Sequence, residues 1–252
     1  MKHSKILSAI LALASIPAFA KPYSASAVPF DFVDISATAS PIAFLHNTDN
    51  ATTFVPIGFD FQIYGGSYAN VSVSSNGLLM FGWTNNSPDN SDLTDFPKEP
   101  ASIAVFWDDL VITGGDSTDV FTQLRGIPGS REFIVQWNQV KFFMDSSQSD
   151  SLTFQARLRE ADGSILLSYL DLVIDADPRN NGASATVGIK ADGEQGLDRL
   201  LLAFNSGPNA FVGTGQSTLI TDDGAVTPEP GSIALLGSGL ALLACRRRSL
   251  SK

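Results

Sequence analysis

Residues 71–83 read Val-Ser-Val-Ser-Ser-Asn-Gly-Leu-Leu-Met-Phe-Gly-Trp, which is a strong pattern for a β-hairpin. Val71 and Val73 alternate with serines, Asn76-Gly77 follows, and a second apolar run comes after it. Asn-Gly between apolar runs favours a hairpin turn whose two central residues both have positive φ. The stretch therefore predicts two antiparallel strands joined by a tight turn.

Similar short strands are expected along the rest of the chain. They are predicted at residues 30–33, 57–64, 103–107, 120–124, 133–140, 152–158, 165–169, 185–189, 200–204 and 210–220. The continuous apolar run 103–107 is typical of a central strand covered on both faces, and the polar residues 84–95 predict a long surface loop. With frequent turns and almost no helical periodicity, residues 30–222 predict an all-β fold, a single antiparallel, jelly-roll-like β-sandwich.

The first 20 residues have the pattern of a secretory signal peptide. A basic start, Lys2-His3-Lys5, precedes apolar residues 6–16 and the small residues Ala18 and Ala20. This order predicts an N-terminal signal helix over residues 1–20 and cleavage after Ala20. Residues 21–29 are small and polar, and are expected to be a linker.

The C-terminal residues from 223 onward have the pattern of a second membrane-directed signal. Residues 223–230 predict a Pro-rich linker ending in Pro228-Glu229-Pro230, where the prolines oppose helix formation. An apolar helix at 231–245 would span about 21 Å over its first 14 residues, against a bilayer core of roughly 30 Å. Arg246, Arg247 and Arg248 would hold its end in the cytoplasm. A short transmembrane anchor and a helix packed on the domain are the alternatives.

The tail residues 228–250 resemble the PEP-CTERM sorting signal of Gram-negative bacteria. The resemblance implies that exosortase, a membrane enzyme, is a partner and cleaves near Pro228-Glu229-Pro230. It also implies export through the inner membrane, transient anchoring there, and release to the cell surface or the extracellular space. That family is associated with biofilm formation, which makes exopolysaccharide or other surface proteins further expected partners.

Residues 71–82 and 103–109 resemble the nidogen-type extracellular domain, and the likeness spans roughly residues 54–205. This resemblance implies an extracellular-matrix or adhesive protein, and it carries no catalytic residues over to this chain.

Composition narrows the chemistry of the exported part. Residues 21–230 hold 10 basic and 26 acidic residues, a formal charge of −16, which repels nucleic acid. The one cysteine, Cys245, lies in the tail, so the exported part has no disulfide and no thiol nucleophile. His46 is its one histidine and is expected to be a surface residue without a catalytic partner.

Two groups of polar residues are candidates for ligand binding. Asp108 and Asp109 end the strand at 103–107; the favoured interpretation is that one caps turn amides and the other is solvated. Asp175 and Asp177 lie in a polar loop, where turn chemistry is again favoured. Ca²⁺ or glycan binding is the alternative for Asp108 and Asp109, and Ca²⁺ binding is the alternative for Asp175 and Asp177. A hydrolase using Asp108 and Asp109 is a further alternative.

The tryptophans divide into two kinds. Trp107 and Trp137 lie in apolar strands and are expected in the core, whereas Trp83 borders a polar loop and is the candidate for an exposed sugar-stacking platform. Taken together, the sequence predicts an exported, non-enzymatic structural or adhesive protein without cofactor. The alternative is a lectin-like, Ca²⁺-dependent glycan-binding module.

Overall fold

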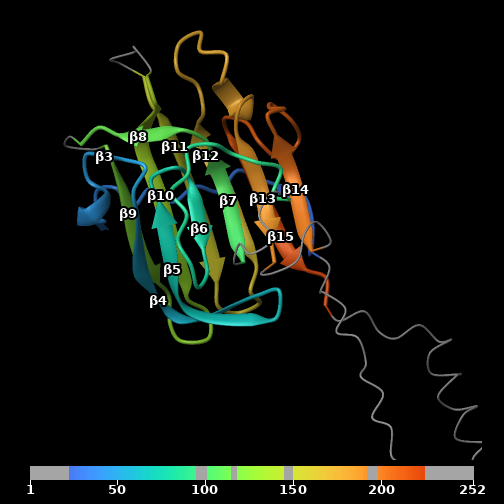
Figure 1. Cartoon of the computed structure of the whole chain (residues 1–252). Coiled ribbons are helices and arrows are strands. Elements are labelled where there is room, and N and C mark those ends of the chain that lie inside the picture. The colour runs from blue at the N-terminus through green and yellow to red at the C-terminus, as the bar shows by residue number, and fades with distance from the viewer. Residues whose placement is uncertain (1–22, 95–100, 115–117, 145–149, 192–197, 225–252) are drawn as a thin grey trace, which may run out of the picture.

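The computed structural model describes residues 23–94, 101–114, 118–144, 150–191 and 198–224. These residues form two antiparallel sheets packed face to face, which confirms the predicted all-β sandwich (Figure 1). Among them, no helix has both the length and the apolar character needed to cross a bilayer. The expected signal helix and tail helix lie outside the described residues.

The smaller sheet has six strands in the order β14-β13-β7-β6-β5-β4. They are β4 (Thr52–Ile63), β5 (Gly66–Ser74), β6 (Leu78–Met80), β7 (Ser102–Trp107), β13 (Thr186–Lys190) and β14 (Arg199–Phe204). Consecutive strands from β4 to β7 are direct neighbours, so local hairpins build most of this sheet.

The larger sheet has nine strands in the order β1-β15-β12-β11-β10-β8-β3, with β9 also paired to β10 and β2 paired to β9. They are β1 (Tyr23–Val28), β2 (Ser40–Pro41), β3 (Thr48–Asp49), β8 (Leu110–Ile112), β9 (Asp119–Arg125), β10 (Glu132–Phe142), β11 (Leu152–Arg159), β12 (Ile165–Asp171) and β15 (Gln216–Asp222). Two short 3-10 helices lie between strands: η1 (Ala43–Leu45) between β2 and β3, and η2 (Asn180–Gly182) between β12 and β13 of the smaller sheet.

Apolar side chains from both sheets fill the space between them. The Trp137 ring stacks on Phe154 with centroids 5.1 Å apart, and its Nε1 donates to the Ser74 carbonyl across the sandwich at 2.9 Å. The Tyr169 hydroxyl likewise donates to the carbonyl of Val105 at 3.0 Å. These bonds satisfy the polar ends of two large buried rings, and they join the sheets without a covalent link.

The hairpin at Asn76-Gly77 forms as predicted, with one difference in its backbone. Gly77 has a φ of 77°, whereas Asn76 does not have positive φ. The Asn76 side chain is buried, and its amide nitrogen donates to Asn50 Oδ1 at 2.8 Å while its oxygen accepts the N–H of Leu110 at 3.0 Å. The Asn76 side chain therefore connects the turn to the loop at Asn50 and to the start of β8 at Leu110. An Asn side chain in a solvent-exposed turn would not make these contacts.

β7 is the central, doubly covered strand that its apolar sequence predicts, with all six residues buried. Its outer face is covered by the segment 84–94, expected as a surface loop. Leu93 packs there on Trp107 and is 2% exposed, and Trp107 Nε1 donates to the Ser87 carbonyl at 3.0 Å. The segment folds back because Trp107 and its neighbours offer an apolar face to cover.

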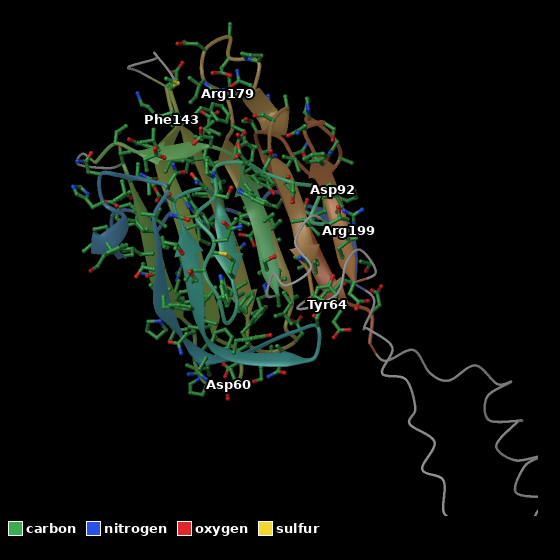
Figure 2. All side chains as sticks on the ribbon, in the orientation of Figure 1. Asp60, Tyr64, Asp92, Phe143, Arg179 and Arg199 are labelled. Atoms are coloured by element: carbon green, nitrogen blue, oxygen red, sulfur yellow. The ribbon has the colours of Figure 1, made fainter. Side chains whose placement is uncertain are left out.

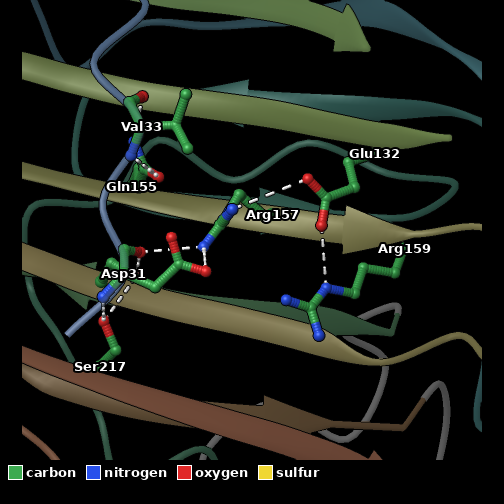
Figure 3. A network of polar contacts seen from close by, with 8 residues as sticks. Asp31, Val33, Glu132, Gln155, Arg157, Arg159 and Ser217 are labelled. Carbon is green, nitrogen blue, oxygen red and sulfur yellow. Dashed lines mark hydrogen bonds and ion pairs between the residues drawn. The ribbon is translucent and has the colours of Figure 1, made fainter. Parts of the chain in front are cut away.

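The N-terminal part of the domain corrects two predictions. Residues 21–29 are not a linker, because Tyr23–Val28 form β1 and pair with β15 along their whole length. Residues 30–33 are not a strand, because the segment 29–36 crosses the outer face of the larger sheet instead of joining it (Figure 3). We call this segment the strap.

Buried polar side chains of the sheet hold the strap by its backbone. Gln155 accepts the N–H of Val33 at 3.2 Å and donates to its carbonyl at 3.0 Å, while Gln136 accepts the N–H of Ile35 at 2.9 Å. Arg157 donates to the Asp31 carbonyl at 2.9 Å and pairs with its carboxylate (Figure 3). The strap thus obtains from side chains the hydrogen bonds that a strand obtains from its neighbours.

The last strand begins later than predicted, at Gln216 instead of at residue 210. Asn209 Oδ1 accepts the N–H groups of Phe211 and Val212 at 2.8 and 3.1 Å. This side-chain bonding closes a local turn that competes with strand pairing.

Gly77→Ala should be strongly destabilising, because an added Cβ would lie 2.1 Å from the carbonyl oxygen of Phe106. We expect the free energy of unfolding to fall by roughly 2–4 kcal/mol in denaturant titration. Gly65→Ala is the matched control, since Gly65 has a φ of 78° and no atom within 4 Å of the added Cβ. It should cost roughly 1 kcal/mol, and equal losses in the two variants would contradict the close approach to Phe106.

Gln155→Leu tests the strap. The variant leaves the N–H and carbonyl of Val33 without partners, so we expect a loss of roughly 1–3 kcal/mol and faster hydrogen exchange at the Val33 amide. Gln123→Leu is the control, because the Gln123 side chain donates an exposed hydrogen bond to Thr38 at 3.2 Å and does not contact Val33 by any hydrogen bond among the described residues. Unchanged exchange at Val33 in Gln155→Leu would show that the strap does not depend on these bonds.

Candidate functional site

Both chain ends leave the sandwich at one pole, which we call the terminal pole. Tyr23 begins β1 and pairs with Asp222 at the end of β15. The hydroxyl of Tyr23 accepts the backbone N–H of Tyr64 at 3.1 Å, which places both residues beside the turn after β4. Figure 2 shows Tyr64 at this pole and Arg179 and Phe143 at the opposite one.

The opposite pole gathers the carboxylates that the sequence singled out, and we call it the acidic pole. Phe143 N–H donates to the Asp109 carbonyl at 2.8 Å, and Arg179 forms an ion pair with Asp177 at 2.7 Å. The structure therefore brings the segment of Asp108 and Asp109 and the loop of Asp175 and Asp177 to the same end of the molecule.

Asp108 is 7% exposed and occupied by internal hydrogen bonds. Its Oδ1 accepts the N–H of Asp109 at 2.9 Å, and its Oδ2 accepts the Ser184 hydroxyl at 2.5 Å. Burial raises the pKa of Asp108, and the hydrogen bond from Ser184 opposes that rise. This geometry agrees with the turn-capping interpretation of Asp108.

Asp109 differs from the expected solvated carboxylate. Its Oδ1 is buried and has no hydrogen-bond partner among the described residues. Burial raises the pKa of Asp109, the carboxylate of Asp49 raises it further, and the guanidinium of Arg179 opposes both effects. The side chain is held in a place where its negative charge is unfavourable.

The loop of Asp175 and Asp177 is organised by its own hydrogen bonds. Arg179 lowers the pKa of Asp177 by donating to both of its carboxylate oxygens, at 2.9 and 2.7 Å. The Arg179 guanidinium also lies over the Phe142 ring, 4.4 Å from its centroid. Asn180 Oδ1 accepts the N–H of Ile174 at 2.7 Å, so the loop has the turn chemistry that was the favoured interpretation.

No three His, Cys, Asp or Glu side chains of the described part of the chain come together as metal ligands would. Ca²⁺ binding at Asp108, Asp109, Asp175 or Asp177 therefore stays a prediction. Trp83 is 66% exposed, as a stacking platform requires, while Trp107 and Trp137 are buried.

His46 has a partner that the sequence did not indicate. Its Nδ1 lies 2.6 Å from Oδ2 of Asp119, a carboxylate that is 5% exposed. Asp119 Oδ1 also accepts the N–H of Val120 at 3.2 Å. The two residues lie 73 positions apart, so spacing along the chain carried no signal of this pair.

The profile of the NIDO-related family matches residues 22–229, well over half of the chain. The chain belongs to the NIDO-related family. A second profile, the PEP-CTERM protein-sorting motif, matches residues 226–248. No curated protein and no solved structure matches this NIDO-related chain.

The two matches confirm both resemblances drawn from the sequence. The NIDO-related domain is extracellular, and the sorting motif marks an exported protein that exosortase recognises and that a C-terminal anchor holds in the membrane before processing. Pro228-Glu229-Pro230, Arg246, Arg247 and Arg248 fall within the matched motif but outside the described residues, as do Ala18 and Ala20.

Asp109→Asn should stabilise the protein at neutral pH in a metal-free buffer with chelator. Folding raises the pKa of Asp109. The ionised carboxylate therefore destabilises the folded state at pH values above the raised pKa, and this loss of stability is absent at pH values below the pKa of Asp109 in the unfolded chain. We expect the melting temperature to rise by roughly 2–4 °C at pH 7, the shift that about 1 kcal/mol produces in a domain of this size. The difference should shrink as the pH falls through the raised pKa.

Asp223→Asn is the control, because Asp223 lies at the other pole and accepts a hydrogen bond from Ser24 at 2.5 Å. A lower melting temperature for Asp109→Asn in chelator would contradict the unfavourable burial of this charge. If Ca²⁺ raised the melting temperature of the wild type and not of Asp109→Asn, the Ca²⁺ prediction would be supported.

Proposed function

We propose that the β-sandwich is a non-enzymatic structural or adhesive module of the cell surface or extracellular matrix, delivered and then released by its C-terminal tail. The observation that carries the proposal is the pairing of Tyr23 with Asp222. Because both ends leave at one pole, the rest of the domain projects from its attachment point as a rigid body.

The chemistry of the acidic pole supports a non-enzymatic role. A general acid or base needs a carboxyl group that a substrate can reach. Asp108 instead accepts bonds from Ser184 and from the backbone of Asp109, and Asp177 is bonded to Arg179. The families that match are of non-catalytic sorting or structural types, which favours the same role.

Release at the tail is proposed to occur close to the domain. Five residues separate Asp222, the last residue of β15, from Pro228, so the cleaved region lies within about 20 Å of the terminal pole. Exosortase would therefore work beside the folded sandwich, and the released product would be the sandwich with a short C-terminal extension.

Intact-mass measurement of cell-bound and secreted protein tests this proposal. We expect the secreted wild type to lack residues 1–20 and the apolar tail after Pro228-Glu229-Pro230. Glu229→Ala/Pro230→Ala should stay in the membrane fraction at full tail length, because the motif that the enzyme recognises is changed. Asp223→Asn, just before the motif, should be processed like the wild type. Secreted wild-type protein that keeps residues 231–252 would contradict processing.

A further inference from the structure

A groove follows the outer side of the β4–β5 hairpin, away from the acidic pole carboxylates. Two depressions of about 580 and 420 Å³ form it, and they share Ala69 and Asn70. Asp60 and Arg131 are among the residues that line the first depression, and Phe54 and Gly82 are among those that line the second. Because both share the same stretch of β5, they form one continuous path along the hairpin.

An irregularity in the pairing of β4 with β5 shapes this groove. The register shifts between Pro56 and Phe61, so residues 57–60 lie opposite Ala69 alone. A bulge of this kind bends the strand and changes the direction of its side chains. Arg131 fixes the bulge, because its Nη1 donates to the Gly58 carbonyl at 2.6 Å.

Two of the side chains that line the groove, Arg131 and Glu160, form an ion pair. Arg131 pairs with Glu160 through two hydrogen bonds, with Nε–Oε2 and Nη2–Oε1 distances of 2.8 and 2.5 Å. Its guanidinium also lies 5.5 Å from the centroid of the Phe59 ring. The positive charge is therefore matched by a carboxylate and is not available to an anionic ligand.

The groove offers polar and aromatic groups that the protein itself does not use. Asp60 and Asn70 are exposed, and no hydrogen bond or ion pair within the described residues involves their side chains. Phe54, which lines the second depression together with Asn70, is 52% exposed. Exposed rings supply stacking surfaces, and a free carboxylate and amide supply hydrogen bonds to neighbouring hydroxyl groups.

We propose that this groove binds a segment of an uncharged polysaccharide. An open path along two strands suits a polymer lying across it better than a small molecule, which favours an enclosed pocket. Asp60 and the charge of −16 on the exported part repel anionic polymers. The proposal rests on the proposed extracellular role and gives that role a ligand class.

Affinity electrophoresis of the purified mature protein tests the groove. The probes are dextran, mannan and a soluble β-glucan, with alginate as the anionic comparison. We expect at least one uncharged polymer to retard the wild type, and Phe54→Ala, Asp60→Asn and Asn70→Ala each to weaken that retardation at least about fivefold. Chelator should not change the retardation, since no ligand group in the groove requires a metal.

Phe44→Ala is the matched control, because Phe44 is a 66% exposed ring on η1 and does not line the groove. Thermal melts would verify that each variant is folded. The proposal is overturned if no uncharged polymer retards the wild type, if alginate alone does so, or if the groove variants bind as the wild type does. None of these results affects the tail-processing experiment, so the two proposals fail separately.

Discussion

The structure depends on how its N-terminal segment is fastened across the larger sheet. Without cysteines in the exported part, hydrogen bonds and packing must hold this segment in place. Gln155, Gln136 and Arg157 are buried polar residues on the outer face of the sheet, and each would be costly to bury without a partner. The strap backbone supplies those partners, so strap and sheet each satisfy groups that the other would leave unpaired.

The pairing of β1 with β15 determines how the domain is presented. The strap runs directly from β1, and β1 is held beside β15, so both segments that lead to membrane signals leave at the terminal pole. The acidic pole and most of the sandwich surface face away from that attachment. Asp108 and Asp177 of the acidic pole are occupied by internal hydrogen bonds, whereas the side chains of Asp60 and Asn70 in the β4–β5 groove make no hydrogen bond or ion pair within the described residues. The groove is therefore the better candidate for a ligand surface.

Local sequence patterns predicted much of the fold and little of the site. Asn76-Gly77 and the apolar run of β7 depend on neighbouring residues, so the hairpin and the central strand could be recognised. The strap could not, because Val33 bonds to Gln155, 122 positions away. The unpaired oxygen of Asp109 and the register shift after Pro56 likewise arise from contacts between distant segments. Such contacts leave no periodic signal in the chain.

The most direct measurement is a cross-link between β1 and β15, the first and last strands of the sandwich. Ser24 and Thr221 face each other in the β1–β15 register, with their hydroxyl oxygens 3.4 Å apart. Facing residues of antiparallel strands lie within disulfide reach, so the exported variant Ser24→Cys/Thr221→Cys/Cys245→Ser should oxidise to a disulfide that intact mass detects. Pairing Ser24→Cys with Thr218→Cys, three residues out of register, should leave free thiols. Free thiols in the facing pair would contradict the pairing of β1 with β15.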